Sequence, residues 1–445
     1  MRREAAREYL RGALWAMPSV AVVAALIAGS VLSSITIAPG SALAPLVFQG
    51  TADDARNLLI GIASTMVTVI ALVLGLTVVA LQLASTQFSP RLLRNFLRDL
   101  TNQLTLSSFV ATFAYSTAGL YTVGVSGGER TSDYPRLAVS GALLLIFVSM
   151  IMLVFFVHHL AHSIQVDQVM VGVERETLHV IEHSMGTVAA PGALPRRPDH
   201  AVPLVATRSG YVQTLHLEAL ATTAAEHRAV LVLVPMVGEH VVKGAPLAWV
   251  WPDRAAGSVA TAPTRPSLDA LRSALSRGVR VGFERTAEQD AAFGVRQLAD
   301  VASKALSPAI NDPYTAVQAV DHLSVVLSSL AKRTLGPVTV SDPSGVPRVH
   351  VPARDWEYFL DLGLGQVRRY GHTEPRVVLA LFRVARDIAT FCDSDRRTAV
   401  RRYVEVLLDD VGRDIVQAAD RDPLLEHGRA LLLELTGGGL RAPTW

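Results

Sequence analysis

Two short histidine strings are the residues of this chain whose types and spacing could do metal chemistry. His179, Glu182 and His183 form the pattern H-x-x-E-H, which places two imidazoles on one helical turn beside a carboxylate. His158 and His162 have the same four-residue spacing at the end of an apolar segment. A catalytic zinc normally takes three protein ligands, and no distinctive segment follows that would supply the third. We therefore predict no metal site, and a zinc-dependent membrane hydrolase is the least favoured alternative for this chain.

The lysine that a covalent cofactor would need is displaced from the expected turn. Gly210-Tyr211-Val212, followed by the segment 237–247, resembles a biotinyl/lipoyl-like small barrel, in which paired glycines make turns between short strands. In the carrier version a lysine lies at a hairpin tip beside Met, but Pro235 and Met236 occupy that place here and Lys243 lies in the later turn. We predict a structural barrel with no cofactor. Because no catalytic triad order, phosphate-binding loop or dinucleotide motif is evident, we also predict no enzymatic activity.

A third pattern, in the apolar segment Leu58–Leu83, points to a membrane. The segment holds 26 residues without a charge, about 39 Å of helix, which is enough to cross a bilayer. At 100° per residue its small and polar side chains fall on one stripe, which also includes two apolar residues. Lipid does not need such a stripe, whereas a neighbouring helix or a water-filled path does. The predicted path-lining residues are Gly61, Ser64, Thr65, Thr68, Leu72, Gly75, Val79, Gln82 and Thr86.

Four apolar segments would form the helices that position these residues. They predict helical spans at 13–37, 58–83, 104–125 and 137–160, within a four-span transmembrane domain of residues 1–163. Arginines concentrate in the N-terminal tail and in the loop between the second and third spans, where Arg91, Arg94 and Arg98 lie. By the positive-inside rule both termini are cytoplasmic. We predict a multi-pass protein of the bacterial inner membrane.

The rest of the chain is more polar and predicts a cytosolic part. We expect a membrane-exit helix and linker over 164–203, the small β-barrel-like domain over 204–252, and a helical cytosolic domain over 267–437. The predicted fold class is therefore an α-helical integral membrane protein whose cytosolic part combines a small β barrel with a helical domain. The formal net charge of +2 is too small to indicate a nucleic-acid partner.

A dense run of charged and amide side chains opens the expected helical domain. Ser307-Pro308 and Asp312-Pro313 each look like a helix N-cap followed by proline at the first helical position. The first interpretation of the run is a buried polar network that holds the fold or a subunit interface; the second is a ligand or ion site. The residues of this predicted network are Arg285, Gln289, Asp290, Arg296, Asp300, Lys304, Ser307, Asn311 and Asp312.

Four strings along the chain resemble one family. They are Leu83-Ala84-Ser85-Thr86-Gln87-Phe88-Ser89-Pro90-Arg91, then Phe113-Ala114-Tyr115, then Gln289-Asp290-x-x-Phe293-Gly294-x-Arg296-Gln297-Leu298-x-Asp300, and finally Ala305-Leu306-Ser307-Pro308-Ala309-Ile310-Asn311-Asp312-Pro313. Together they are similar to the bacterial predicted membrane proteins grouped as domain of unknown function 2254. The resemblance implies the architecture of four spans plus a cytosolic part and supplies no activity.

The stripe and the topology favour an oligomeric inner-membrane channel or pore for ions. The span 58–83 would line the path, Leu72 and Val79 could form rings that gate by dewetting, and the cytosolic part would be a vestibule or regulatory domain. The expected partners are membrane lipid, further copies of this chain and ions. The alternative is a membrane-anchored scaffold or regulator without a pore, in which the stripe serves helix packing alone.

Overall fold

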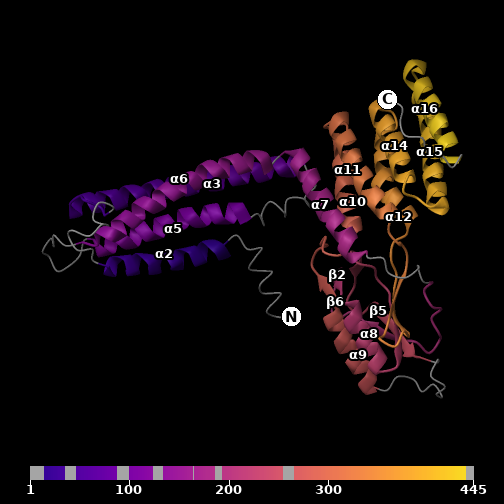
Figure 1. Cartoon of the computed structure of the whole chain (residues 1–445), viewed down its shortest axis with the longest axis horizontal. Helices are drawn as coiled ribbons and strands as arrows, with labels where there is room; N and C mark the ends of the chain where they lie inside the picture. The colour runs from indigo at the N-terminus through magenta and orange to yellow at the C-terminus, as the bar shows by residue number, and fades with distance from the viewer. Residues whose placement is uncertain are drawn as a thin grey trace. The chain divides into compact units, whose positions relative to one another are not determined.

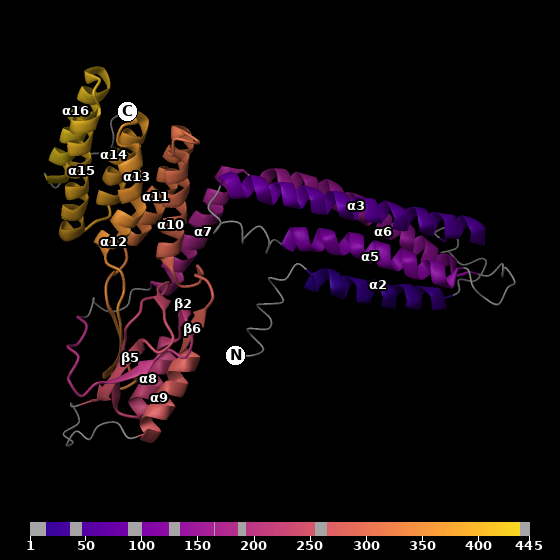
Figure 2. The same ribbon diagram turned by 180° about the vertical axis from the view of Figure 1, so that it is seen from behind.

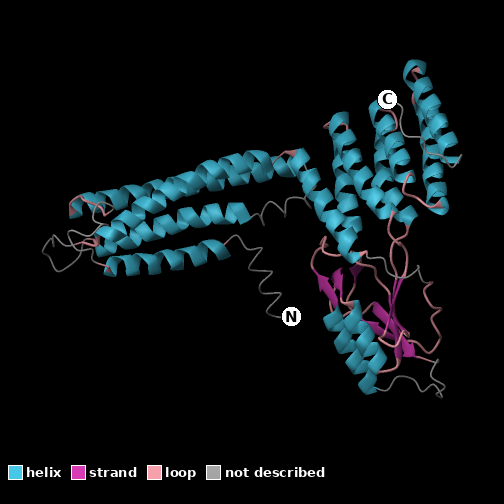
Figure 3. Cartoon of the chain, viewed as in Figure 1, coloured by secondary structure: helices cyan, strands magenta, loops and turns pink. Residues whose placement is uncertain are grey.

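The computed structural model describes residues 15–35, 47–87, 100–123, 134–163, 165–185, 193–253 and 265–436. Two compact units divide the chain, unit 1 over residues 1–169 and unit 2 over residues 170–445. Each unit has its own core, and each is described by itself. Figure 3 shows helices throughout the chain and strands in unit 2.

Unit 1 is a bundle of helices that lie side by side (Figure 1 and Figure 2). Its helices are α2 (Ala16–Ser34), α3 (Ala52–Gln87), α5 (Leu100–Thr122) and α6 (Arg136–Ser163). The long helix α3 begins at a capping box, in which the Thr51 backbone N–H donates to the Asp54 carboxylate at 2.9 Å and the Asp54 N–H donates to the Thr51 hydroxyl at 3.2 Å. Three of the described helices are long and apolar enough to cross a membrane: α2, α3 over Ala52–Gln82, and α6 over Arg136–Ala161.

The third expected span, 104–125, coincides with α5 but is not among those three helices. α5 packs against α2, α3 and α6, and several of its polar side chains are buried, among them Gln103, Thr112 and Ser116. The Thr112 hydroxyl lies 2.8 Å from the hydroxyl of Ser149 on α6. Polar residues inside a membrane bundle usually face its interior, because lipid offers them no partner. The predicted count of four spans is therefore not confirmed, since these polar residues lower the hydropathy of the third segment.

Unit 2 begins within α7 (Val166–Ser184) and contains two open sheets rather than the predicted barrel. One sheet has the strand order β1-β5-β3-β8-β7 and the other β4-β2-β6. The strands are β1 (Val202–Val205), β2 (Gly210–Leu215), β3 (Ala229–Leu233), β4 (His240–Val241), β5 (Pro246–Pro252), β6 (Val279–Gly282), β7 (Val338–Ser341) and β8 (Pro347–Val351). No closed barrel forms among these described strands.

The barrel prediction is not confirmed because pairing partners come from distant sequence. β6, β7 and β8 belong to the region 267–437, which was expected to be helical. β3 pairs in parallel with β8 at Leu231 and Val349, and a parallel pairing has no tight turn that a local sequence pattern could reveal. Leu231, Val349 and Val250 are buried together with Leu220 of α8 (Leu217–Glu226) and Leu271 of α9 (Arg265–Gly278). These side chains form the core under the sheets.

Four of the described helices of unit 2, α11, α13, α15 and α16, pack against α14 (Pro375–Ala389). Val377, Leu381, Val384 and Ile388 repeat at helical spacing and are fully buried, which is the pattern of a helix with one core-facing stripe. The other helices are α10 (Ala291–Ala305), α11 (Pro313–Ala331), α12 (Trp356–Leu360), α13 (Gln366–Gly371), α15 (Ser394–Asp414) and α16 (Ala418–Thr436), and a π-helical turn, Asp361–Gly365, joins α12 to α13.

Candidate functional site

The polar stripe of α3 lies on the side of the helix that faces away from its own bundle. Leu59, Ile62, Met66, Val73 and Ala80 form the buried face of α3 and are each at most 3% exposed. Every described member of the stripe is instead exposed or half-exposed in the single chain. These members are Gly61, Ser64, Thr65, Thr68, Leu72, Gly75, Val79 and Gln82; the side chain of Thr86 lies outside the described residues.

The glycines of the stripe show that no described part of the chain covers it. A Cβ atom built on Gly61 or Gly75 would meet no other atom within 4 Å. At Gly119 of α5, by contrast, an added Cβ would lie 3.2 Å from the Leu59 side chain, so that glycine allows α3 and α5 to approach. Close packing inside the bundle therefore uses glycines other than those of the stripe. The stripe remains available to something outside the chain.

The threonine hydroxyls of the stripe donate hydrogen bonds to their own helix. Thr65 donates to the Gly61 carbonyl at 2.7 Å, and Thr68 donates to the Ser64 carbonyl at 3.3 Å. Such bonds satisfy the hydroxyl hydrogen without water and leave the oxygen lone pairs facing outward. α3 also has a third, apolar face that is equally exposed in the single chain, formed by Ile60, Val67, Leu74 and Val78. The helix therefore presents buried, polar and apolar faces.

In unit 2, the predicted polar network has its buried centre at Asp290, whose side chain is fully buried at the start of α10. Arg285 donates from Nε to Oδ2 at 2.5 Å and from Nη2 to Oδ1 at 3.1 Å. Arg354 adds a bond from Nη1 to Oδ1 at 3.2 Å. Burial opposes the charged form of Arg285, but the hydrogen bonds and charge of Asp290 outweigh burial and raise the pKa of Arg285. Two guanidinium groups thus share one buried carboxylate.

Gly238 shows how tightly the chain closes around that carboxylate. Its φ of +84° is in the left-handed region, and an added Cβ would lie 1.9 Å from Asp290 Oδ2. Glycine is therefore required at this position for two independent reasons, backbone conformation and space. The turn between β3 and β4 lies directly against the start of α10.

The other residues of the string Gln289 to Gly294 also serve packing. The Gln289 carboxamide accepts from the Leu215 N–H at 2.8 Å and donates to the Leu215 carbonyl at 3.4 Å, which ties α10 to the end of β2. The Phe293 ring lies under the Arg285 guanidinium, 5.4 Å from it. An added Cβ on Gly294 would lie 1.8 Å from the Thr177 hydroxyl oxygen, so this glycine lets α7 and α10 touch. The string is a packing junction for β2, α7 and α10.

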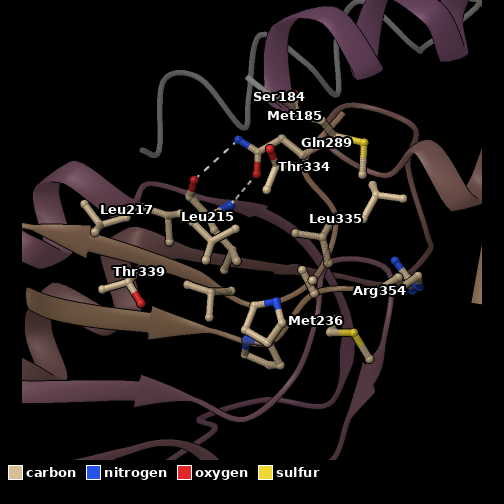
Figure 4. A pocket seen from close by; sticks show the side chains of 18 of the residues that line it. Ser184, Met185, Leu215, Leu217, Met236, Gln289, Thr334, Leu335, Thr339 and Arg354 are labelled. Atoms are coloured by element: carbon tan, nitrogen blue, oxygen red, sulfur yellow. Dashed lines mark hydrogen bonds between the residues drawn. The ribbon is translucent and has the colours of Figure 1, made fainter. Parts of the chain in front are cut away.

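A cavity of about 790 Å³ opens beside this junction, within unit 2 (Figure 4). Its walls come from the end of α7, the end of β2, the start of α8, the start of α10, and the segments around β7 and β8. Leu215, Leu217, Met236, Leu335 and Phe359 supply much of the apolar wall. Glu218 and Arg354 are the lining side chains with a permanent charge at neutral pH.

Comparison with known proteins gives the same family as the four strings. The family of predicted membrane proteins named domain of unknown function 2254 matches residues 11–387. The chain belongs to this family. An uncharacterized protein of Mycobacterium bovis and two uncharacterized proteins of Mycobacterium tuberculosis are each 43% identical to the chain over 440 residues, which is 97% of this chain and 81% of each relative. No solved structure matches the chain.

In this member of the domain of unknown function 2254 family, the rest of the predicted network forms separate groups. Arg296 and Asp300 pair along α10 at 2.7 Å. Asp312 accepts from the Thr315 hydroxyl at 2.6 Å and from the Thr315 N–H at 3.1 Å, and these bonds lower its pKa. The bond from the N–H confirms Asp312 as the N-cap of α11. The second predicted cap is wrong: the Ser307 hydroxyl donates back to the Lys304 carbonyl at 2.7 Å, and a turn rather than a helix follows. Ser307 ends α10 instead of starting another helix.

Two residues near these groups differ from the rest in their backbone conformation or in their distance along the sequence. Asn311 has a φ of +50°, a left-handed conformation that asparagine tolerates better than most residues. Arg354, which the sequence interpretation missed, lies 64 residues after its partner Asp290. An isolated arginine in a loop between β8 and α12 has no local pattern that indicates such a pairing. The fold alone brings it to the start of α10.

The histidine string lies on α7. The His179 and His183 rings are 4.0 Å apart between centroids, and His183 Nδ1 lies 2.8 Å from the His179 carbonyl oxygen. Within the described ranges, no group of three or more His, Cys, Asp or Glu side chains is placed to hold a metal. Cys392 is buried, and burial raises the pKa of its thiol to about 11, which keeps it protonated at neutral pH.

Proposed function

We propose that the protein forms an oligomeric channel in which α3 of each copy lines a path for ions. The observation that supports this function is the outward direction of the polar stripe. No described residue covers its members, and an added Cβ on either of its two glycines would meet none of the described atoms within 4 Å. In a membrane, a polar stripe of this length faces either another helix or water. In a ring of copies whose stripes point inward, the stripes would face a central water-filled path.

The side chains of the stripe would interact only weakly with a passing ion. Threonine and serine oxygens can contact partly hydrated ions, and the exposed helix at Gly61 and Gly75 leaves room. Asp, Glu, Lys and Arg are absent from the segment 58–83, so no charged ring fixes the sign of the ion. Leu72 and Val79 are 54% and 51% exposed within the stripe. We assign them to apolar rings that close the path by dewetting.

The proposed topology has four spans and both termini in the bacterial cytoplasm. α5 would be the third span: it is 23 residues long, and α2, α3 and α6 pack against it, so its buried polar side chains need not face lipid. Placing the arginines of the N-terminal tail and of segment 91–98 at the inner surface follows the positive-inside rule. Unit 2 would then be cytosolic and act as a vestibule or a regulatory domain.

A second function, a membrane-anchored scaffold or regulator without a pore, has one observation in its favour. The hydroxyls of Thr65 and Thr68 already donate to their own helix, so the stripe does not require water. In that case the stripe would pack against a helix of another copy or protein, as small residues do in membranes. The two functions differ in whether water reaches the stripe.

The decisive experiment compares two neighbouring valines. Val78 and Val79 have the same side chain and similar exposure, 54% and 51%, but lie about 100° apart around α3, on the apolar face and in the stripe. Each is replaced by cysteine in a Cys392→Ala background, and the protein is reconstituted in liposomes. A membrane-impermeant, charged thiol reagent should modify Val79→Cys and leave Val78→Cys unmodified, because only the stripe meets water.

Further cysteine variants supply a protected control and test whether the water-filled path is continuous. Met66→Cys, on the face buried against the bundle, should be protected under both functions. Thr68→Cys and Gly75→Cys should react together with Val79→Cys if the path is continuous. Equal protection at Val78 and Val79 rules out a water-filled path at this depth and leaves the scaffold. An image of the detergent-solubilised assembly with α3 on the outside would lead to the same conclusion.

A further inference from the structure

The cavity of unit 2 contains a charged group whose hydrogen bonds are incomplete. The Arg354 side chain is 10% exposed and lines the cavity. Among the described residues its guanidinium donates one hydrogen bond, from Nη1 to Asp290 Oδ1, and its Nε is buried without a partner. Arginine has five N–H donors, so most of its capacity is unused. The Nε atom has almost no accessible surface while the cavity is empty, so a ligand would reach the guanidinium through its Nη groups.

The charges around Arg354 favour an anion. Asp290 is already bonded through both oxygens by Arg285, so Arg354 is the second cation on one carboxylate. The Tyr358 ring lies 5.1 Å from the Arg354 guanidinium and holds it from one side. A guanidinium whose Nη groups keep donors is suited to a carboxylate, which accepts charge-assisted hydrogen bonds. Glu218 is the acidic side chain of the cavity lining.

The rest of the lining mixes apolar side chains with hydroxyls, among them Thr334 and Thr339, which Figure 4 labels. Figure 4 shows Met236 and Leu335 next to Arg354, and Leu215 between them and Leu217. Gln289 also lines the cavity, but its carboxamide is committed to both backbone groups of Leu215, so it acts as wall and not as a binding group. A volume of about 790 Å³ lies within the range of small-molecule sites, which combine apolar walls with a few fixed polar groups.

We propose that this cavity binds a small organic acid, with its carboxylate on Arg354 and its apolar body against Leu215, Met236 and Leu335. The site goes beyond the proposed channel and does not depend on it, because all of its residues belong to unit 2. It joins the end of α7, the sheets and the start of α10. A bound acid would therefore tighten contacts between these elements.

The test uses 4-phenylbutyrate as the probe and the full chain in lipid nanodiscs, with empty nanodiscs as the blank. Isothermal titration should show saturable binding of one probe per chain. The uncharged 4-phenylbutanamide, of nearly the same shape, should bind at least about tenfold more weakly, since a hydrogen bond to a charged group exceeds a neutral one by this order. Arg354→Gln should weaken 4-phenylbutyrate binding by a similar factor.

A second pair of variants keeps the test decisive if Arg354→Gln fails to fold. Ala219 and Thr222 are both exposed on α8, but only Ala219 lines the cavity. Ala219→Trp should occupy part of the cavity and weaken binding while leaving Arg354 and Asp290 unchanged, and Thr222→Trp should bind as the wild type does. The proposal is overturned if the wild type shows no saturable binding, if the amide binds as tightly as the acid, or if Ala219→Trp binds normally. None of these readouts depends on ion conduction.

Discussion

The stripe of α3 and the cluster at the start of α10 are both unusually polar stretches, but their surroundings differ. Around α3 no described residue of the chain covers Gly61 or Gly75, and the hydroxyls bond to their own helix. Around α10 the Asp290 carboxylate is fully buried, and Arg285 and Arg354 neutralise it. A stretch rich in polar residues can therefore end up in two opposite structural settings. In one region it leaves an interface open to something outside the chain, and in the other it closes the fold internally.

The largest expected effect is on ion leak through the α3 path. Leu72→Ser and Val79→Ser should each raise the basal conductance of reconstituted protein, because a polar ring lowers the cost of wetting a constriction. Val78→Ser, on the apolar face, is the matched control and should leave the conductance unchanged. Conductance is measured in planar bilayers. If all three variants conduct like the wild type, the assignment of Leu72 and Val79 to a gate is wrong.

The second effect is on the stability of unit 2. Asp290→Ala should destabilise the protein by about 3–5 kcal/mol, because it leaves two arginines around an empty carboxylate position. Asp300→Ala breaks the pair with Arg296, whose side chain is 38% exposed, and should cost about 1 kcal/mol or less. Denaturant unfolding of the full chain, followed by tryptophan fluorescence, measures both. If both variants lost the same free energy of unfolding, the buried cluster would not be the centre of the junction.

The smallest effect concerns the cap of α11. Asp312→Ala should destabilise by about 0.5–2 kcal/mol, the usual contribution of an N-cap. Because hydrogen bonds from Thr315 lower the pKa of Asp312 in the folded state, its contribution is present above the ordinary aspartate pKa and disappears as the pH falls through the lowered value. The difference between wild type and variant should therefore shrink in acid.

Ser307→Ala is the control for this cap. The Ser307 hydroxyl only donates to the preceding turn, so its removal should change stability less than Asp312→Ala does. Asn311→Ala adds a separate cost, since alanine fits the left-handed backbone poorly. A loss of function in Asp312→Ala with unchanged melting temperature and assembly would contradict a capping role and favour a ligand site.

Local sequence patterns predicted those features whose cause is local. The apolar runs predicted α2, α3 and α6, because a helix that crosses lipid must be apolar over its length. Asp312 before Pro313 predicted the start of α11, because a cap acts over three residues. The same pattern failed at Ser307-Pro308, where the chain makes a turn at the end of α10. A cap motif says that a helix could start, and the surrounding packing decides whether it does.

The features that were missed depend on contacts between distant residues. The sheets recruit β6, β7 and β8 from a region that was expected to be helical, and this replaces the predicted barrel. The polar residues of α5 lie inside the bundle, so neither their number nor their spacing showed whether the third segment spans the membrane. Arg354 reaches Asp290 only after β8 has paired with β3.

The sequence by itself determined the family, the apolar helices of unit 1 and the periodicity of the α3 stripe, because each follows from residue type and spacing along one segment. Only the tertiary structure decided which side of α3 is covered, since that depends on where α5 and α6 pack. It also decided that Asp290 is buried between two arginines and that a cavity opens beside Arg354. Burial and charge pairing are properties of residues brought together from distant parts of the chain, and spacing along one segment cannot specify them.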